Sequence, residues 1–99
     1  MRIITKVHLR DYAQRRPTTA AALEHWRLTV EAADWKTPQD AQTSFSSARP
    51  IANGRVIFEI ADGHRMIVGC DYERKLVFMK FIGTHAEYDK VDATTVNLY

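Results

Sequence analysis

The chain has 99 residues, of which 45% are hydrophobic and 26% are charged, and its formal net charge is +2. This length suffices for one domain around one core and is too short for two. The sequence has no apolar run near the ~20 residues of a membrane span, no signal-peptide pattern at its start, and a single cysteine, Cys70, which excludes an internal disulfide. We therefore expect a cytoplasmic protein with no membrane partner.

The first half of the chain is predicted to be mainly helical. Residues 2–5 favour a short strand, and residues 6–15 favour a short helix that ends before Pro17, because the residue before a proline is pushed out of the helical region. A second helix is expected after Pro17. Its apolar positions recur every three or four residues, at Leu23, Trp26, Val30 and Ala33.

Three strands are predicted in the second half, at residues 55–60, 64–70 and 75–82. The turns between them are short, at residues 62–63 and 71–74, so the strands are expected to be antiparallel neighbours. Residues 49–50 fit a loop or an edge strand, and residues 93–99 fit a last strand or a frayed end. The predicted fold class is α+β, with the N-terminal helices packed on one face of a mostly antiparallel sheet.

The register of the first hairpin is predicted from burial, since a slip of one residue turns every side chain to the other face. A two-residue turn would drive an arginine into the core. A three-residue loop at residues 62–64 avoids this and opposes Phe58 to Val68. The same register opposes Ile60 to Met66 on the buried face.

In the second hairpin, Cys70 is predicted to pair with Lys75, which places Arg65 opposite Lys80. Together with Arg55, these two cations would share the face away from the helices. Because like charges across a sheet are destabilising, this face is either a solvated basic surface or a site for an external anion such as phosphate. Three apolar side chains on the same face are unusual for a purely solvated surface and offer a floor for stacked bases or a partner protein: Ile57, Ile67 and Phe78.

A strand-to-helix junction follows the third strand. After Gly83, residues Thr84 and Glu87 have the spacing of a capping box, in which the side chain of each bonds the backbone N–H of the other. A short C-terminal helix is therefore expected to begin at His85 and to carry Tyr88 one turn later.

These two side chains suit metal-free RNA cleavage. His85 is the natural proton-transfer group near neutral pH, and Tyr88 could orient a nucleophile or a leaving group. The three cations of the sheet could stabilise the phosphorane that forms when a 2′-OH attacks its own phosphate, and the products would be a 2′,3′-cyclic phosphate and a 5′-OH. His85 could equally be a helix-start residue without a catalytic role. His64, expected in a turn, has no companion at ligand spacing, so neither a metal nor another cofactor is expected.

Three segments carry a family resemblance: NGRVIF at residues 53–58, HRMIV at residues 64–68 and FIGTHAEYD at residues 81–89. They closely resemble the HigB-type toxins of the RelE superfamily of bacterial toxin–antitoxin systems. The order of elements, with helices first and an antiparallel sheet after them, is similar over most of the chain.

The resemblance implies a ribosome-dependent mRNA endonuclease that cuts codons in the ribosomal A site, inhibits translation and is neutralised by a HigA-type antitoxin with a helix-turn-helix. The implied catalytic residues are His85, Tyr88, Arg65 and Lys80, and Arg55 joins Arg65 and Lys80 as an implied RNA- and phosphate-binding residue. The alternative is a non-catalytic RNA- or protein-binding domain on the same fold, whose binding would fall with salt but would not be followed by strand scission.

Overall fold

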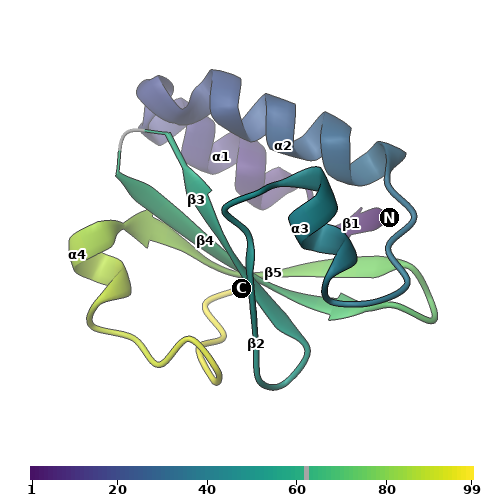
Figure 1. Cartoon of the computed structure of the whole chain (residues 1–99). Coiled ribbons are helices and arrows are strands. Elements are labelled where there is room, and N and C mark those ends of the chain that lie inside the picture. The colour runs from purple at the N-terminus through teal and green to yellow at the C-terminus, as the bar shows by residue number, and fades with distance from the viewer. Residues whose placement is uncertain (62) are drawn as a thin grey trace.

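The computed structural model describes residues 1–61 and 63–99, which form a sheet with helices on one face and a short helix with the C-terminal tail on the other (Figure 1). The helices are α1 (Val7–Arg15), α2 (Ala20–Ala32), α3 (Asp40–Ser44) and α4 (His85–Tyr88), and a 3-10 turn (Pro17–Thr19) joins α1 to α2. The strands are β1 (Arg2–Ile4), β2 (Arg49–Ile51), β3 (Arg55–Ile60), β4 (His64–Asp71) and β5 (Leu76–Thr84).

The strands lie in the order β1-β5-β4-β3-β2. The short strand β1 runs parallel to β5, and the other neighbouring pairs are antiparallel. This arrangement confirms the predicted α+β class and the three central strands. Of the two alternatives for residues 49–50, the edge strand is correct, because these residues begin β2.

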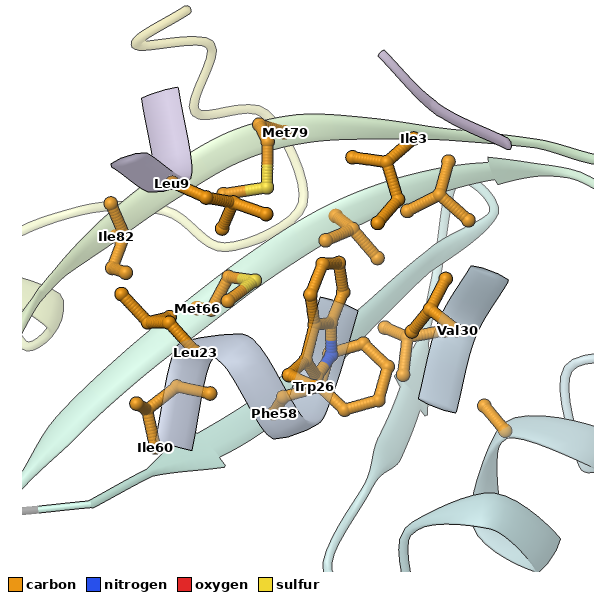
Figure 2. Close-up of a cluster of buried hydrophobic side chains, with 14 of the residues drawn as sticks. Ile3, Leu9, Leu23, Trp26, Val30, Phe58, Ile60, Met66, Met79 and Ile82 are labelled. Carbon is orange, nitrogen blue, oxygen red and sulfur yellow. The ribbon is translucent and has the colours of Figure 1, made fainter. Parts of the chain in front are cut away.

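The main core lies between α2 and the sheet (Figure 2). Trp26 is only 1% exposed, and its ring meets the Phe58 ring edge-on with the centroids 5.5 Å apart. Leu23 and Val30 are buried beside it, as the apolar spacing of the second helix predicts. The helix therefore owes its position to the burial of one apolar stripe against β3 and β4.

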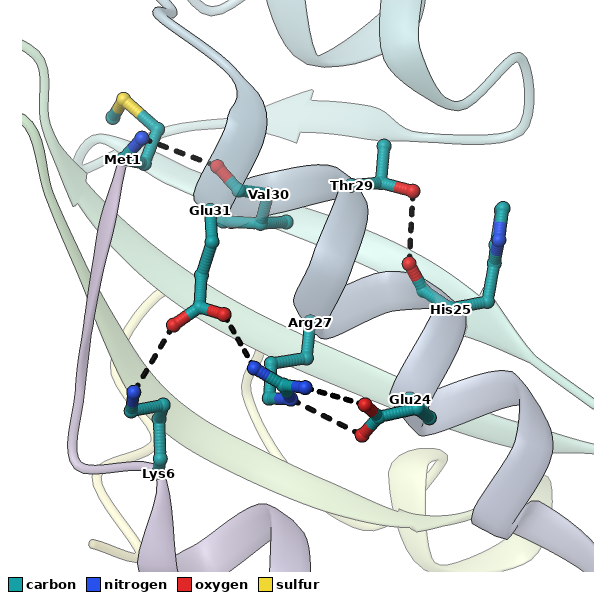
Figure 3. Close-up of polar contacts among 8 residues, drawn as sticks. All are labelled: Met1, Lys6, Glu24, His25, Arg27, Thr29, Val30 and Glu31. Carbon is teal, nitrogen blue, oxygen red and sulfur yellow. Dashed lines mark hydrogen bonds and ion pairs between the residues drawn. The ribbon is translucent and has the colours of Figure 1, made fainter.

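A chain of ion pairs links the start of α1 to the outer surface of α2 (Figure 3). Lys6 Nζ lies 3.1 Å from Glu31 Oε2, and Arg27 bridges Glu31 and Glu24. The hydrogen bond from Lys6 is the main reason that the pKa of Glu31 lies below its ordinary value. Exposed pairs of this kind contribute little to stability, so apolar packing dominates the attachment of the helices.

The first hairpin keeps the predicted faces but not the predicted register. Phe58 pairs with Met66 instead of Val68, and Ile60 pairs with His64 instead of Met66. His64 belongs to β4 and is buried, so its predicted place in the turn is wrong. A displacement of two residues leaves every side chain on its own face, and for that reason the burial pattern could not detect it.

The loop of this hairpin contacts the start of α4. Asp62, the first residue of the predicted turn at residues 62–63, lies outside the described residues. Gly63 has a φ angle of 74°, in the left-handed region that glycine adopts without a steric cost. Its carbonyl oxygen accepts a hydrogen bond of 2.9 Å from the backbone N–H of His85. This contact fixes the first residue of α4 against the β3–β4 loop.

The second hairpin contains a β-bulge at Lys80. Val68 pairs with Met79 while Ile67 pairs with Phe81, so Lys80 is the extra residue of β5. Met79 lies in the core beneath the helices, whereas Phe81 belongs to a buried cluster on the opposite face. The bulge thus changes the register so that apolar residues of β5 can fill both faces.

Two predicted pairs of this hairpin are wrong. Arg65 lies opposite Gly83 and not opposite Lys80, and Cys70 lies opposite Val77 and not opposite Lys75. The turn comprises residues 72–75 instead of 71–74, which displaces the pairing by two residues, and the bulge between Ile67 and Val68 displaces the Arg65 end by one more. The predicted juxtaposition of two cations across the sheet is therefore absent from the described pairing.

The sheet face away from the helices is covered. Ile57, Ile67 and Phe81 are 4%, 0% and 5% exposed. The side chains that pack against them come mainly from α4 and the tail: Ile51, Tyr88, Val91, Ala93 and Val96. The expectation that Ile57 and Ile67 form an open floor for stacked bases is therefore wrong, because the chain itself occupies that floor.

The tail is neither of the two predicted alternatives, a last strand or a frayed end. Leu98 donates its backbone N–H to the carbonyl oxygen of Lys80 at 2.9 Å. The Tyr99 ring stacks on His8 of α1 with the centroids 4.2 Å apart. Residues 93–99 thus follow an irregular path that is fixed by contacts at several points (Figure 1).

Replacement of Ile67 by alanine tests the second buried face. We expect Ile67→Ala to lower the free energy of unfolding by about 2–5 kcal/mol, because it leaves a cavity beneath the tail. The control is Leu28→Ala, whose side chain is 54% exposed on α2 and whose loss should change stability by less than about 0.5 kcal/mol. Urea denaturation measures both, and equal effects would contradict a covered face.

Candidate active site

The capping box positions α4 directly at the end of β5. Thr84 Oγ1 accepts a hydrogen bond of 3.2 Å from the Glu87 backbone N–H, and Glu87 Oε1 accepts one of 2.8 Å from the Thr84 backbone N–H. Both predicted contacts are confirmed. A Cβ atom on Gly83 would lie 2.8 Å from Phe81 Cζ and 3.1 Å from Glu87 Oε1, so any larger residue would force these side chains to move.

Tyr88 lies between two arginine side chains. The guanidinium carbon of Arg65 is 4.8 Å from the centroid of the Tyr88 ring, in the range of a cation–π contact. Arg49 Nη2 donates to the Tyr88 hydroxyl oxygen at 3.2 Å. The ring is half-buried against Ile67 and its neighbours. Tyr88 is therefore contacted by Arg65 on its ring face, by Arg49 at its hydroxyl and by the buried cluster around Ile67.

The strand register explains why both arginines reach the same tyrosine. Arg49 pairs with Ile57, and Ile57 pairs with Ile67, so Arg49 starts from the face covered by α4. Arg65 is two residues from Ile67 along β4 and points to that same face. It also contacts Glu59, its partner on β3, at 3.4 Å.

His85, the first residue of α4, and Asp89, its C-cap residue, form an exposed pair. His85 Nδ1 lies 3.2 Å from Asp89 Oδ2, four residues later. An ionised carboxylate can only accept, so this contact places the ring proton on Nδ1 and leaves the lone pair of a neutral ring on Nε2. The side chain of His85 is 55% exposed, and its ring centroid is 6.3 Å from that of Tyr88. Asp89 thus orients the imidazole through Nδ1, while the rest of the side chain remains accessible to solvent.

Arg55 holds the tail. It is 9% exposed, and its Nη1 donates to the carbonyl oxygens of Ala93 at 3.1 Å and Val96 at 2.5 Å. Asn53 Nδ2 adds a bond of 2.9 Å to the carbonyl oxygen of Thr94. Because its guanidinium donates to two backbone carbonyls of the tail, this arginine stabilises the tail across the sheet.

Lys80 also contacts the tail. Its Nζ donates to Asn97 Oδ1 at 3.3 Å and lies 5.7 Å from the centroid of the Phe78 ring. Of the five predicted site residues, the structure therefore brings His85, Tyr88 and Arg65 together around α4. It places Arg55 and Lys80 in contact with the tail.

Two residues of this site were missed by sequence reasoning. Asp89 follows His85 by four positions, a spacing that joins side chains on one helical face, so the sequence did contain its signal. Arg49 is 39 residues from Tyr88 and meets it only through the register of the edge strand β2. No local sequence pattern predicts that contact.

Neither a metal cluster nor a membrane helix is found in the part of the chain that the structure describes. Within residues 1–61 and 63–99, no three His, Cys, Asp or Glu side chains gather as metal ligands. No helix in the same ranges is long and apolar enough to cross a bilayer. His64 begins β4, and its ring meets Tyr12 of α1 edge-on at 5.7 Å.

Comparison with known proteins gives two similarities. Residues 19–91 match a protein family described as HigB toxin, the RelE-like toxic component of a toxin–antitoxin system. A curated relative, the mRNA interferase HigB of Escherichia coli O6:H1 (strain CFT073), is 29% identical over 94 residues. That alignment covers 92% of this chain and 91% of the relative. The matched family range includes α4 and the two arginines that flank Tyr88.

Loss of the Arg55 guanidinium should weaken the whole tail. We expect Arg55→Ala to lower the free energy of unfolding by about 2–4 kcal/mol, because two carbonyl oxygens lose a charged donor. Arg74→Ala is the control, since its side chain is 78% exposed in the β4–β5 turn and should change stability by less than about 0.5 kcal/mol. Urea denaturation measures both variants. Equal stabilities would contradict the anchoring role of Arg55.

The capping box should weaken in acid. Hydrogen bonds from the Thr84 backbone and side chain lower the pKa of Glu87 below its ordinary value of 4.5. The stabilisation is therefore complete above that value and is lost as the pH falls through the lowered pKa. We expect Glu87→Gln to cost up to ~1 kcal/mol near pH 7 and the difference from wild type to shrink toward pH 3. Urea denaturation at several pH values would reveal a constant difference if the carboxylate had no such role.

Proposed function

This chain belongs to the HigB toxin family, the RelE-like toxic components of toxin–antitoxin systems, and from that membership we propose that it is an endoribonuclease that cleaves mRNA and thereby inhibits translation. The observation that carries the proposal is the group on α4, where the His85–Asp89 pair lies beside a tyrosine flanked by two arginines. The relative from E. coli, named an mRNA interferase, supports the same activity.

The proposed reaction is attack of a ribose 2′-OH on the adjacent phosphate. The 2′-oxygen–phosphorus bond forms, the bond from phosphorus to the 5′-oxygen breaks, and the products are a 2′,3′-cyclic phosphate and a 5′-OH. His85 accepts the 2′ proton at Nε2, since Asp89 holds Nδ1. Asp89 is thus a positioning residue, while His85 is proposed to touch the reacting atoms.

Tyr88 is proposed to donate a proton to the leaving 5′-oxygen. Its hydroxyl oxygen already accepts a hydrogen bond from Arg49, so the hydroxyl proton is free to point toward substrate. Arg65, stacked on the ring, is assigned to the charge that develops on the phosphorane oxygens. Lys80 and Arg55 contribute positive potential to the same face, although both contact the tail in this structure.

The substrate is proposed to be mRNA in the ribosomal A site. The partner that silences the protein is proposed to be a HigA-type antitoxin with a helix-turn-helix. Membership of a toxin–antitoxin family supports an antitoxin partner of some kind. An open, exposed His85 supports a large substrate over a small molecule enclosed in a pocket. Co-expression with the adjacent reading frame would test the antitoxin by restoring growth.

Cleavage of mRNA on programmed ribosomes tests the activity. We expect the wild type to cut within the A-site codon and His85→Ala to be slower by about 10²–10⁴-fold, because proton transfer is lost. Asp89→Asn should fall between them, since the imidazole keeps its nitrogen but loses its carboxylate partner. His25→Ala, an exposed histidine on α2, should cleave as fast as the wild type. End-group analysis should find cyclic phosphate and 5′-OH.

The possible results distinguish an error in the proposed catalytic residues from an error in the proposed activity. Persistent cleavage by His85→Ala would remove His85 from the mechanism and transfer the chemistry to Tyr88 or Arg65. No cleavage by the wild type, with or without ribosomes, would favour the non-catalytic binding domain. Cleavage of free mRNA at the same rate would contradict the ribosome requirement alone.

A further inference from the structure

We propose that Arg49 binds an RNA phosphate, the one adjacent to the phosphate held by Arg65, and that Tyr88 fixes the guanidinium for this purpose. This inference rests on the proposed ribonuclease function and adds a substrate-binding residue to it. Arg49 lies outside the sheet strands and the C-terminal motif that the sequence pointed to, at the start of the edge strand β2.

Among the described residues, the Arg49 side chain has a hydrogen-bond partner but no acidic side chain that neutralises its charge. Its Nη2 donates to the Tyr88 hydroxyl at 3.2 Å, and no Asp or Glu oxygen lies within 4.0 Å of it in the described residues. A guanidinium has five N–H donors, so most remain available. The residue is also exposed, and an anion from solution can therefore reach it.

Arg49 differs from the two other arginines described on this face of the sheet. Arg55 is buried and directs its donors at tail carbonyls. Arg65 is paired with Glu59 at 3.4 Å and stacked on Tyr88. Arg49 alone among these three combines exposure, a fixed position and an unpaired charge.

The geometry around Tyr88 brings two cationic side chains to one residue. One guanidinium lies over the ring face and another bonds the hydroxyl, so two like charges flank one side chain. Anions bound at both guanidinium groups would offset this repulsion, and planar guanidinium groups match phosphate in a bidentate manner. A chain of phosphates satisfies both arginines at once, whereas a single small anion occupies one. RNA is therefore the ligand that this pair fits.

The test replaces individual phosphates of the mRNA by neutral methylphosphonates, one at a time next to the cleavage site. Single-turnover cleavage on programmed ribosomes is measured for the wild type, Arg49→Ala and Arg10→Ala, an exposed arginine on the far helix α1. We expect Arg49→Ala to reduce kcat/KM by about 10–100-fold, in line with the loss of one charged contact. Arg49→Lys should recover part of it, since the charge returns without the bidentate geometry.

One substituted phosphate should slow the wild type and Arg10→Ala but have no further effect on Arg49→Ala, because the contact is already gone. If every phosphate replacement slowed Arg49→Ala as much as the wild type, the Arg49 contact would be disproved, but the proposed ribonuclease activity would not be. If Arg49→Ala cleaved at the rate of Arg10→Ala, the inference would fail in the same way. A wild type that cleaves no RNA would overturn the proposed function and this inference with it. Circular dichroism and urea denaturation would establish that Arg49→Ala folds as the wild type does.

Discussion

Strand β5 must bury apolar side chains on both of its faces, and the rest of the structure depends on how it does so. Met79 and Ile82 lie in the core beneath the helices, whereas Phe81 lies in the cluster beneath the tail. Strict alternation cannot satisfy this set, and the extra residue Lys80 resolves the conflict by shifting the pairing with β4. The bulge therefore sets the pairing of the last residues of β5, which lead directly into α4.

The position of α4 follows from that end point through short-range contacts. Gly83 permits the close approach of Phe81 and Glu87, and the capping box starts the helix at the next residue. A helix of one turn is too short to be stable by its own hydrogen bonds. It is stabilised here by its cap, by the bond from His85 to Gly63 and by the burial of Tyr88. The histidine and its aspartate are then exposed on the outer surface of a well-supported turn.

The sequence-based predictions were correct where an element depends on residues close together in the chain, and wrong where it depends on contacts between distant segments. The second helix and the capping box depend on residues three or four positions apart, and both were predicted correctly. The bulge at Lys80 could not be predicted, because it depends on the tail covering the second face. The same covering explains why Arg55, predicted as a phosphate ligand, has backbone carbonyls as partners. Arg49 was missed because its contact with Tyr88 requires the register of an edge strand.

The covered face changes how the proposed site is understood. A floor of Ile57 and Ile67 open to bases would have made the sheet itself the binding surface, with the cations spread across it. Instead, these side chains form a second core that supports α4, and Arg55 secures the tail that covers them. Functional groups need a rigid support to keep their geometry, and a buried cluster supplies it better than an exposed sheet. The proposed reactive surface then lies outside this cluster, where Arg49, Arg65 and His85 surround Tyr88.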